Sequence, residues 1–185
     1  MNRHLKSHKR PHHRIEVFVD RIEQLFNSMD PSPVHERDLD DDAEEFIVSW
    51  AQEFPRRDPV SLVIHVNQIP EQQDAQHLVE AAVHHYFAYR AKLNRLEFRH
   101  LLKEGRTSLI IGLVFLGACL LTSEWLLRKQ PGSLSIIARE SLVIAGWVAM
   151  WRPIRIFLYD WWPVLRLGRL YQKLSRMHVE VRKRA

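Results

Sequence analysis

The feature that most constrains the fold is a run of 17 consecutive uncharged residues at positions 107–123, with the sequence TSLIIGLVFLGACLLTS. Extended to position 127, the run has 21 residues and one acid, Glu124. At about 1.5 Å per residue, a helix of this length crosses a hydrocarbon core about 30 Å thick. A helix in a soluble core is rarely apolar on every side. We therefore expect a transmembrane helix at residues 107–127.

A second apolar stretch follows at residues 134–151 and is interrupted by Arg139 and Glu140. The intervening hexapeptide RKQPGS contains Pro-Gly, a strong turn signal. We expect the two stretches to form a transmembrane helical hairpin at residues 107–151. The alternative is one span followed by a helix that lies in the membrane interface.

Charges inside the apolar stretches are the most unusual residues of the hairpin. Intramembrane charges are costly, and they are usually paired or functional. Glu124 and Arg139 fall at similar depths of a hairpin, which makes them a candidate ion pair, and snorkelling to the outer interface is the alternative. Gly112 and Gly117 indicate close packing of the two helices.

The distribution of Lys and Arg predicts how the hairpin is oriented. Residues 86–106 contain six basic residues and residues 152–185 contain nine, whereas the turn contains two, Arg128 and Lys129. The positive-inside rule therefore places both flanks, and both termini, in the cytoplasm. We expect these basic flanks to meet a bilayer with anionic head groups, and we expect no nucleic-acid partner.

The segment before the hairpin carries a mixed pattern. Residues 1–14 are rich in basic residues and histidines and are expected to be a disordered tail. Alternating apolar residues at 15–22 and a β-branched run at 60–66 predict strands, and helical spacing at 38–54 and from about 73 onward predicts helices. The expected apolar face of the helix at 38–54 consists of Ala43, Phe46, Ile47, Trp50 and Phe54. The expected fold class is therefore α+β. A small strand–helix–strand–helix head at residues 15–106 joins the hairpin through a long helix, and an amphipathic C-terminal helix follows.

A heptad seam in the long helix raises the question of self-association. Its members alternate three and four residues apart: Ala75, Val79, Ala82, Tyr86, Tyr89, Leu93 and Leu96. Such a seam is typical of a coiled coil between two chains. It is equally compatible with a helix packed on the sheet of its own chain. We expect a homo-oligomer or a membrane-protein partner.

The C-terminal segment, residues 152–185, has an apolar side rich in aromatic residues and a basic polar side. Segments of this kind lie in the head-group plane, with Trp at the interface and Arg toward phosphate. A ligand for a calmodulin-type groove has the same pattern. The predicted membrane-interface anchors are Trp125, Trp151, Arg152, Arg155, Trp161 and Trp162.

Seven carboxylates lie within residues 36–45, in a chain whose net charge is positive. An EF-hand would need Gly and Glu where this chain has Ala43 and Ser49, so we reject a calcium loop. Acids at a helix start are favoured by the free N–H groups and the dipole, which explains most of them. The preceding turn formers are a possible interaction loop, formed by Asn27, Ser28, Asp30 and Ser32.

No residue pattern indicates catalysis. His77 and His84 are seven residues apart, whereas a zinc pair on a helix prefers a spacing of four. The sequence lacks glycine-rich phosphate loops and the GxSxG nucleophile motif, and Cys119 lies within the first apolar stretch. We expect no catalytic residue, no cofactor and no metal site.

One resemblance is carried by LFNSMDPSP followed by RDLDDDAEEFIVSWA. This pair of segments resembles a signature of small bacterial inner-membrane proteins that have a cytosolic head, a membrane hairpin and no assigned activity. It covers residues 15–51 and, more loosely, the hairpin. The resemblance implies a multi-pass protein of the bacterial inner membrane.

These observations favour a non-enzymatic adaptor, scaffold or accessory subunit that is anchored in the inner membrane. The second hypothesis is a transport or channel component that uses Glu124 and Arg139. The third is a membrane-anchored sensor that binds a metal or another ligand through the acidic and histidine clusters.

Overall fold

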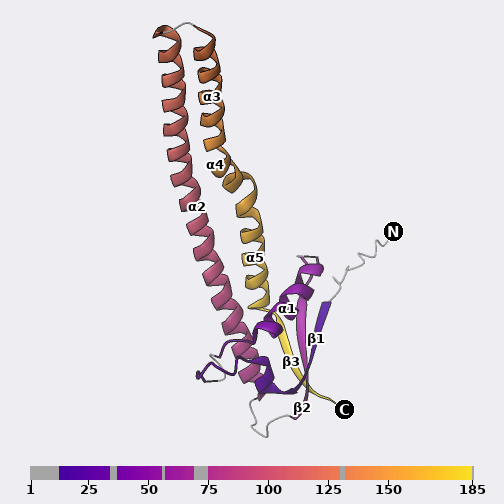
Figure 1. Ribbon diagram of the computed structural model, residues 1–185. Coiled ribbons are helices and arrows are strands. Elements are labelled where there is room, and N and C mark those ends of the chain that lie inside the picture. Colours follow the sequence, from indigo (N-terminus) through magenta and orange to yellow (C-terminus); the bar gives the residue numbers. More distant parts are fainter. Residues whose placement is uncertain (1–12, 34–36, 56, 69–74, 130–131, 185) are drawn as a thin grey trace, which may run out of the picture. The chain divides into compact units, whose positions relative to one another are not determined.

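The computed structural model describes residues 13–33, 37–55, 57–68, 75–129 and 132–184 (Figure 1). The chain is mostly helical, with a three-stranded parallel sheet and two long apolar helices. It divides into two compact units. The head unit comprises Met1–Lys92 and Gly168–Ala185, and the helical unit comprises Leu93–Leu167. The expected basic tail falls almost entirely outside the described residues.

The head unit begins with strand β1 (His13–Arg21), a short 3-10 turn η1 (Ile22–Leu25) and helix α1 (Asp41–Glu53). Strand β2 (Val60–Gln68) and the start of helix α2 (Ala75–Lys129) follow. These elements lie close to the ranges expected from the hydrophobic periodicity.

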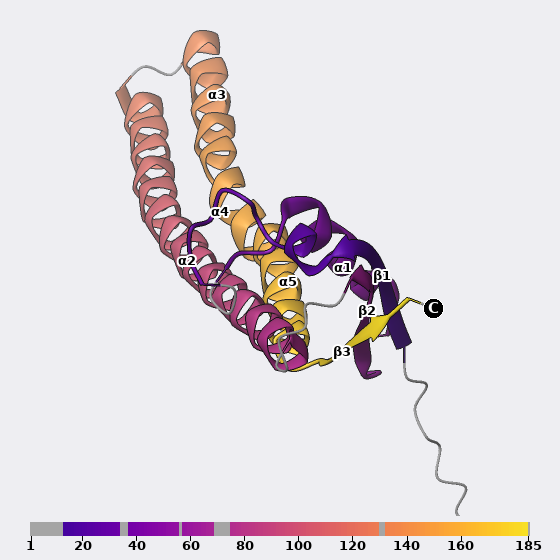
Figure 2. The ribbon, with the colours of Figure 1, turned by 90° about the horizontal axis from the view of Figure 1, so that it is seen from below.

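The three strands are all parallel, and β2 lies between β1 and β3 (Figure 2). β1 pairs with β2 from His13↔Val60 to Arg21↔Gln68, and β3 pairs with β2 from Ser61↔His178 to Val66↔Lys183. The connection from β2 to β3 contains the entire helical unit, because β3 lies at the C-terminal end of the chain.

The core of the head forms on one face of this sheet. Alternate strand residues point to it, as expected for a period of two. Leu62, Ile64 and Val66 of β2 are fully buried, and Phe87 of α2 is the largest fully buried side chain among the described residues. The other core residues of the head include Ile15, Ile47, Ala51, Val79, Val83, Leu174 and Val179.

Strand β3 (His178–Lys183) corrects the expectation of an amphipathic helix running to the C-terminus. The helix α5 (Trp161–Leu174) ends at Leu174, and a tight turn leads into the strand. Val179 and Val181 alternate with charged residues, and Val179 is fully buried. The many basic residues of the segment obscured this alternation in the sequence. Pairing with the free edge of β2 favours the strand conformation over the helix.

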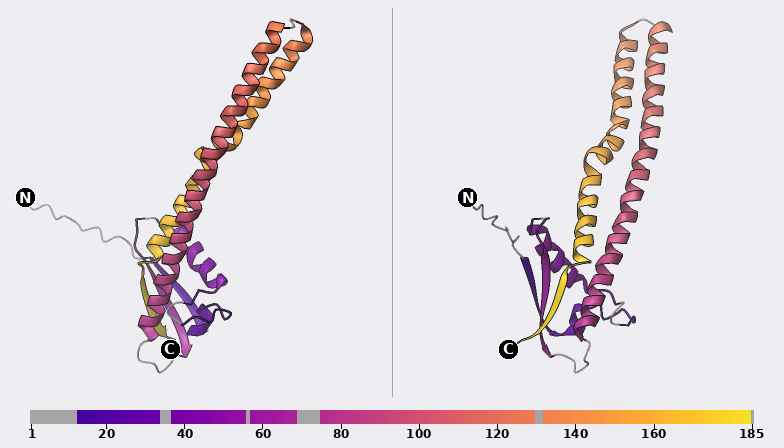
Figure 3. Two further views of the ribbon diagram at one scale, coloured as in Figure 1. Left: turned by 90° about the vertical axis from the view of Figure 1, so that its left-hand side faces the viewer. Right: turned by 180° about the vertical axis from the view of Figure 1, so that it is seen from behind.

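The helical unit contains most of α2, then α3 (Ser133–Ala149), α4 (Trp151–Arg155), one π-helical turn η2 (Ile156–Asp160) and the start of α5. Figure 3 shows α2 and α3 side by side and antiparallel. α2 is continuous through Gly105. The helices at Ala75–Leu126 and Ser133–Leu174 are long and apolar enough to cross a membrane, by length and composition.

Two glycines bring α2 and α3 together. A Cβ on Gly146 would lie 2.8 Å from Leu116 Cδ1 and 3.3 Å from Cys119 Cβ. A Cβ on Gly112 would lie 3.2 Å from the backbone oxygen of Ala149. Close packing at Gly112 is therefore confirmed. The same expectation for Gly117 is wrong, because nothing lies within 4 Å of a Cβ there.

Candidate functional site

The acidic cluster serves two structural purposes in α1. The side chain of Asp40 accepts a hydrogen bond from the backbone N–H of Asp42 and caps the helix. Glu44 instead points inward and is buried. The expected apolar face, with Phe46 and Trp50, is therefore rotated. Both aromatic side chains are more than 40% exposed, and their rings lie 6.0 Å apart.

Glu44 is the centre of a polar network that we call the Glu44 cluster, formed by Glu44, Tyr86, Arg90 and Tyr171. Tyr86 donates a hydrogen bond to Glu44 Oε2, and Tyr171 donates one to Oε1 at 3.1 Å. Nη2 of Arg90 lies 2.7 Å from Oε1 and donates to the Tyr171 hydroxyl at 3.2 Å. Burial raises the pKa of both tyrosines, so both remain donors at neutral pH.

The Glu44 cluster joins three helices of the head unit, α1, α2 and α5. Sequence reasoning missed it, because it counted Glu44 among the helix-start acids. Two signals were present. Glu44 shares a helix face with Ile47 and Ala51, and Tyr86 and Arg90 are one turn apart.

The loop that contains the sequence DPSP (residues 30–33) is stabilised by hydrogen bonds to its own side chains. Asp30 accepts hydrogen bonds from the backbone N–H groups of Ser32 and Asp38, both at 2.9 Å, and Asn27 accepts one from Met29 at 2.9 Å. A side-chain hydrogen bond with Ser32, followed by the backbone hydrogen bond from Asp38, lowers the pKa of Asp30. Asn27, Asp30 and Ser32 of the sequence prediction therefore build the turn, which leaves Met29 90% exposed.

The predicted intramembrane pair is not recorded in the described part of the chain. Glu124 and Arg139 are both exposed, and no ion pair joins them. Pairing of these two residues therefore stays a prediction. An ion pair that the sequence did not predict joins Arg152 to Glu104, within the helical unit.

The predicted interface anchors are largely exposed. Trp125, Trp151 and Trp162 are 58%, 73% and 51% exposed, whereas Trp161 is half-buried and in edge contact with Trp162. The kink at Met150 and the π-helical turn η2 separate α3 from α5. Arg152 and Arg155 are also exposed. These residues thus present aromatic and guanidinium groups to the surroundings of the helical unit.

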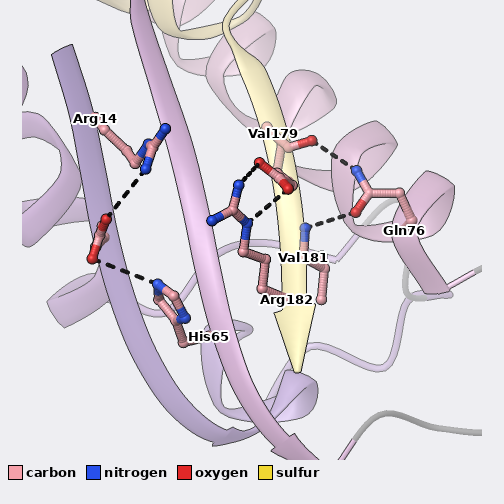
Figure 4. Close-up of polar contacts among 8 residues, drawn as sticks. Arg14, His65, Gln76, Val179, Val181 and Arg182 are labelled. Carbon is pink, nitrogen blue, oxygen red and sulfur yellow. Dashed lines mark hydrogen bonds and ion pairs between the residues drawn. The ribbon is translucent and has the colours of Figure 1, made fainter. Parts of the chain in front are cut away.

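The outer face of the sheet, opposite the core, carries charged side chains from β1 and β3 and the imidazole of His65 from β2 (Figure 4). Glu16 of β1 lies 3.9 Å from Arg14 and 3.6 Å from His65, and Arg182 holds Glu180 through two hydrogen bonds. The Arg182 bonds lower the pKa of Glu180. A shallow hollow of about 340 Å³ opens on this face, lined by Arg14, Glu16, Ser61, Val63, His178 and Glu180.

Three of the described histidines have different partners. His84 hydrogen-bonds the carbonyl oxygen of Met177 at 2.7 Å, and His65 stacks on Phe18 with ring centroids 4.6 Å apart. His13 pairs with Asp58 at 3.1 Å. Among the described residues, no group of three His, Cys, Asp or Glu side chains is placed to hold a metal ion. His4, His8 and His12 lie outside the described residues.

Comparison with known proteins identifies no relative: no family model, no curated protein and no solved structure matches the chain.

Proposed function

We propose that this protein is a two-span component of the bacterial inner membrane whose cytosolic head works as a non-enzymatic adaptor, scaffold or accessory subunit, as an oligomer. In finer detail, a strand–helix–strand–helix head leads through α2 into a transmembrane hairpin. The basic amphipathic helix α5 then returns the chain to the head, which β3 completes.

The observation that carries the proposal is that one sheet contains strands from before and after the two apolar helices. β2 precedes both apolar helices and β3 follows both, yet the two strands form one ladder from Ser61↔His178 to Val66↔Lys183. Segments that share a ladder lie on the same side of a membrane. The shared sheet therefore supports an even number of crossings, as in a hairpin with both flanks on one side.

The charges next to the hairpin support the cytosolic side for those flanks. Arg99, Lys103 and Arg106 precede the first apolar stretch, and Arg152 and Arg155 follow the second. Lys and Arg next to spans favour the cytoplasm. The exposed Trp151 and Trp162 match the aromatic belt of a membrane interface, so anionic lipid head groups are the expected contact of this region.

The outer face of the sheet supports an interaction role for the head. Parallel sheets are usually covered on both faces. Here Phe18 is 59% exposed on the outer face, beside the charged residues of β1 and β3. An open, charged sheet face is a surface for a macromolecular partner more than for catalysis, which needs an enclosed site.

Cysteine labelling in intact cells tests the location and the orientation. In a Cys119→Ala background, Ser133→Cys beside the turn should react with an impermeant maleimide, and Gln52→Cys in α1 should react only after lysis. Labelling of Gln52→Cys in intact cells, or recovery of the protein in the soluble fraction, would overturn the proposal.

Native mass spectrometry of the detergent-solubilised protein, with metal analysis of the same sample, tests the adaptor role. A homo-oligomer or a stoichiometric partner without metal is expected. One metal ion per chain would favour the sensor hypothesis.

A further inference from the structure

We propose that two copies of this chain join their sheets through the outer edge of β1, antiparallel and centred on Val17. The resulting six-stranded sheet has the order β3-β2-β1-β1-β2-β3. This inference rests on the oligomeric assembly in the proposed function, and it names the surface and the register.

The outer edge of β1 offers free backbone groups. The N–H of His13 donates to the carbonyl oxygen of Pro59 at 3.1 Å. The backbone N–H and C=O groups of the odd-numbered residues of β1 therefore point toward β2. The N–H of Asp20 donates to Gln24 Oε1 at 2.9 Å instead, as expected if even-numbered residues face outward. The outward N–H and C=O groups of Arg14, Glu16 and Phe18 have no recorded partner among the described residues.

The opposite edge of the sheet is closed by a side chain. The amide of Gln76 donates to the carbonyl oxygen of Val179 and accepts from the N–H of Val181, both at 2.7 Å (Figure 4). One side chain thus makes the two bonds that a further strand would make. An unprotected edge templates pairing with another chain, and this asymmetry leaves β1 as the edge available for a partner.

Charge complementarity selects a second copy as the occupant. When β1 pairs antiparallel with its own copy about Val17, Arg14 faces Asp20 and Glu16 faces Phe18 of the partner strand. Ile15 then faces Val19 on the core side. Opposite charges across a strand pair are favourable and like charges are unfavourable.

The neighbouring registers of the antiparallel β1–β1 pair are electrostatically less favourable. Only shifts that keep even residues opposite even residues match the backbone groups of the two edges. Centring the pair on Glu16 places two Glu16 carboxylates opposite each other, and centring it on Phe18 places Glu16 opposite Asp20. The Val17 register avoids both repulsions.

Proline at an outward position tests the backbone pairing directly. Glu16→Pro removes one outward N–H and keeps the ladder to β2, because proline is tolerated where its N–H faces solvent. The matched control Glu16→Thr loses the same carboxylate and keeps the N–H. By native mass spectrometry in mild detergent, the wild type and Glu16→Thr should be dimeric. Glu16→Pro should dissociate about tenfold more readily or more.

Charge reversal and cross-linking keep the test informative if Glu16→Pro fails to fold. Arg14→Asp and Asp20→Arg should each weaken the dimer, and the double variant should restore it. In a Cys119→Ala background, Val17→Cys should form an intermolecular disulfide on oxidation, because facing Cα atoms lie about 4.5 Å apart in a non-hydrogen-bonded pair. Val19→Cys should not, because its own copies would be roughly 13 Å apart along the strand.

The outcomes separate the two proposals. A dimer that tolerates Glu16→Pro and shows no Val17→Cys cross-link overturns the β1 interface and leaves the assembly standing, with the exposed seam residues of α2 as its next candidate. A wild type that is monomeric at all concentrations overturns both the interface and the oligomeric assembly. Membrane insertion is measured independently by the labelling experiment.

Discussion

At the scale of single residues, this chain uses its charged side chains mainly to build its own structure. Glu44 illustrates this best. Its side chain is 11% exposed, and both carboxylate oxygens are engaged by Tyr86, Tyr171 and Arg90. A buried charge left without its partner is strongly destabilising, whereas an exposed one is not.

Glu44→Ala should therefore lower the stability of the head by about 2–4 kcal/mol, because it leaves Arg90 and two buried hydroxyls without their acceptor. Arg90 is partly exposed, at 38%, which limits the loss. The exposed neighbour offers the control, since Glu45→Ala should change the stability by no more than about 0.5 kcal/mol. Thermal unfolding in detergent, followed by circular dichroism, compares the two, and equal effects would contradict the role of the Glu44 cluster.

Asp30 makes a prediction about pH. Its pKa is lowered in the folded protein, mainly by the Ser32 hydrogen bond. Its contribution to stability is therefore present above the unfolded pKa of about 3.9 and is lost as the pH falls through the folded value. Asp30→Asn should lower the melting temperature at pH 7, and the difference from wild type should shrink below about pH 4. Ser28→Ala should change the melting temperature at neither pH, and a pH-independent Asp30→Asn effect would refute this account.

At the scale of the elements, the close approach of α2 and α3 depends on glycine at one position and not at another. Gly146→Leu should destabilise the hairpin by about 1–3 kcal/mol, because the added side chain meets Leu116 and Cys119. Gly117→Leu is the matched control, since it is the same substitution into open space. The drop in melting temperature of each variant relative to the wild type, measured in detergent, checks the packing. Similar drops at both positions would show that the helices do not pack at Gly146.

Most elements were predictable from the sequence, and the failures at β3 and at the buried face of α1 have physical causes. The apolar stretches and the strands β1 and β2 carry strong local periodicity, so tertiary context did not need to be known. β3 has six residues, and its period-two pattern becomes meaningful only beside β2, more than 100 residues earlier in the chain. The face of α1 was rotated in the prediction because Phe46 and Trp50 outweighed Glu44 on any hydrophobic scale, while the partners of Glu44 come from α2 and α5.

At the scale of the whole molecule, β3 is the element that closes the head. Val179→Asp should place a charge in the fully buried core beside Leu62, and it should cost several kcal/mol. Limited proteolysis should then cut within residues 57–68, whereas the same residues should resist cleavage in the wild type. Glu180→Asp, a conservative change on the outer face, should leave the digestion pattern unchanged, and resistance of Val179→Asp would show that β3 is dispensable.

The transport hypothesis makes its own prediction at this scale. If Glu124 lies in a conduction path, Glu124→Gln should change ion or proton flux in proteoliposomes and leave the oligomeric state unchanged. The adaptor hypothesis expects no flux in the wild type or the variant above that of empty liposomes. A flux that Glu124→Gln abolishes would replace the adaptor role with transport.

The late position of β3 has a consequence for how the protein is made. The ribosome releases β1, α1 and β2 first, then the apolar helices, and only at the end the strand that covers the second edge of β2. The nascent head therefore waits, with one edge of β2 unpaired, until the whole hairpin has been synthesised. Completion of the sheet consequently requires that both apolar helices have already been synthesised, because β2 precedes them and β3 follows them.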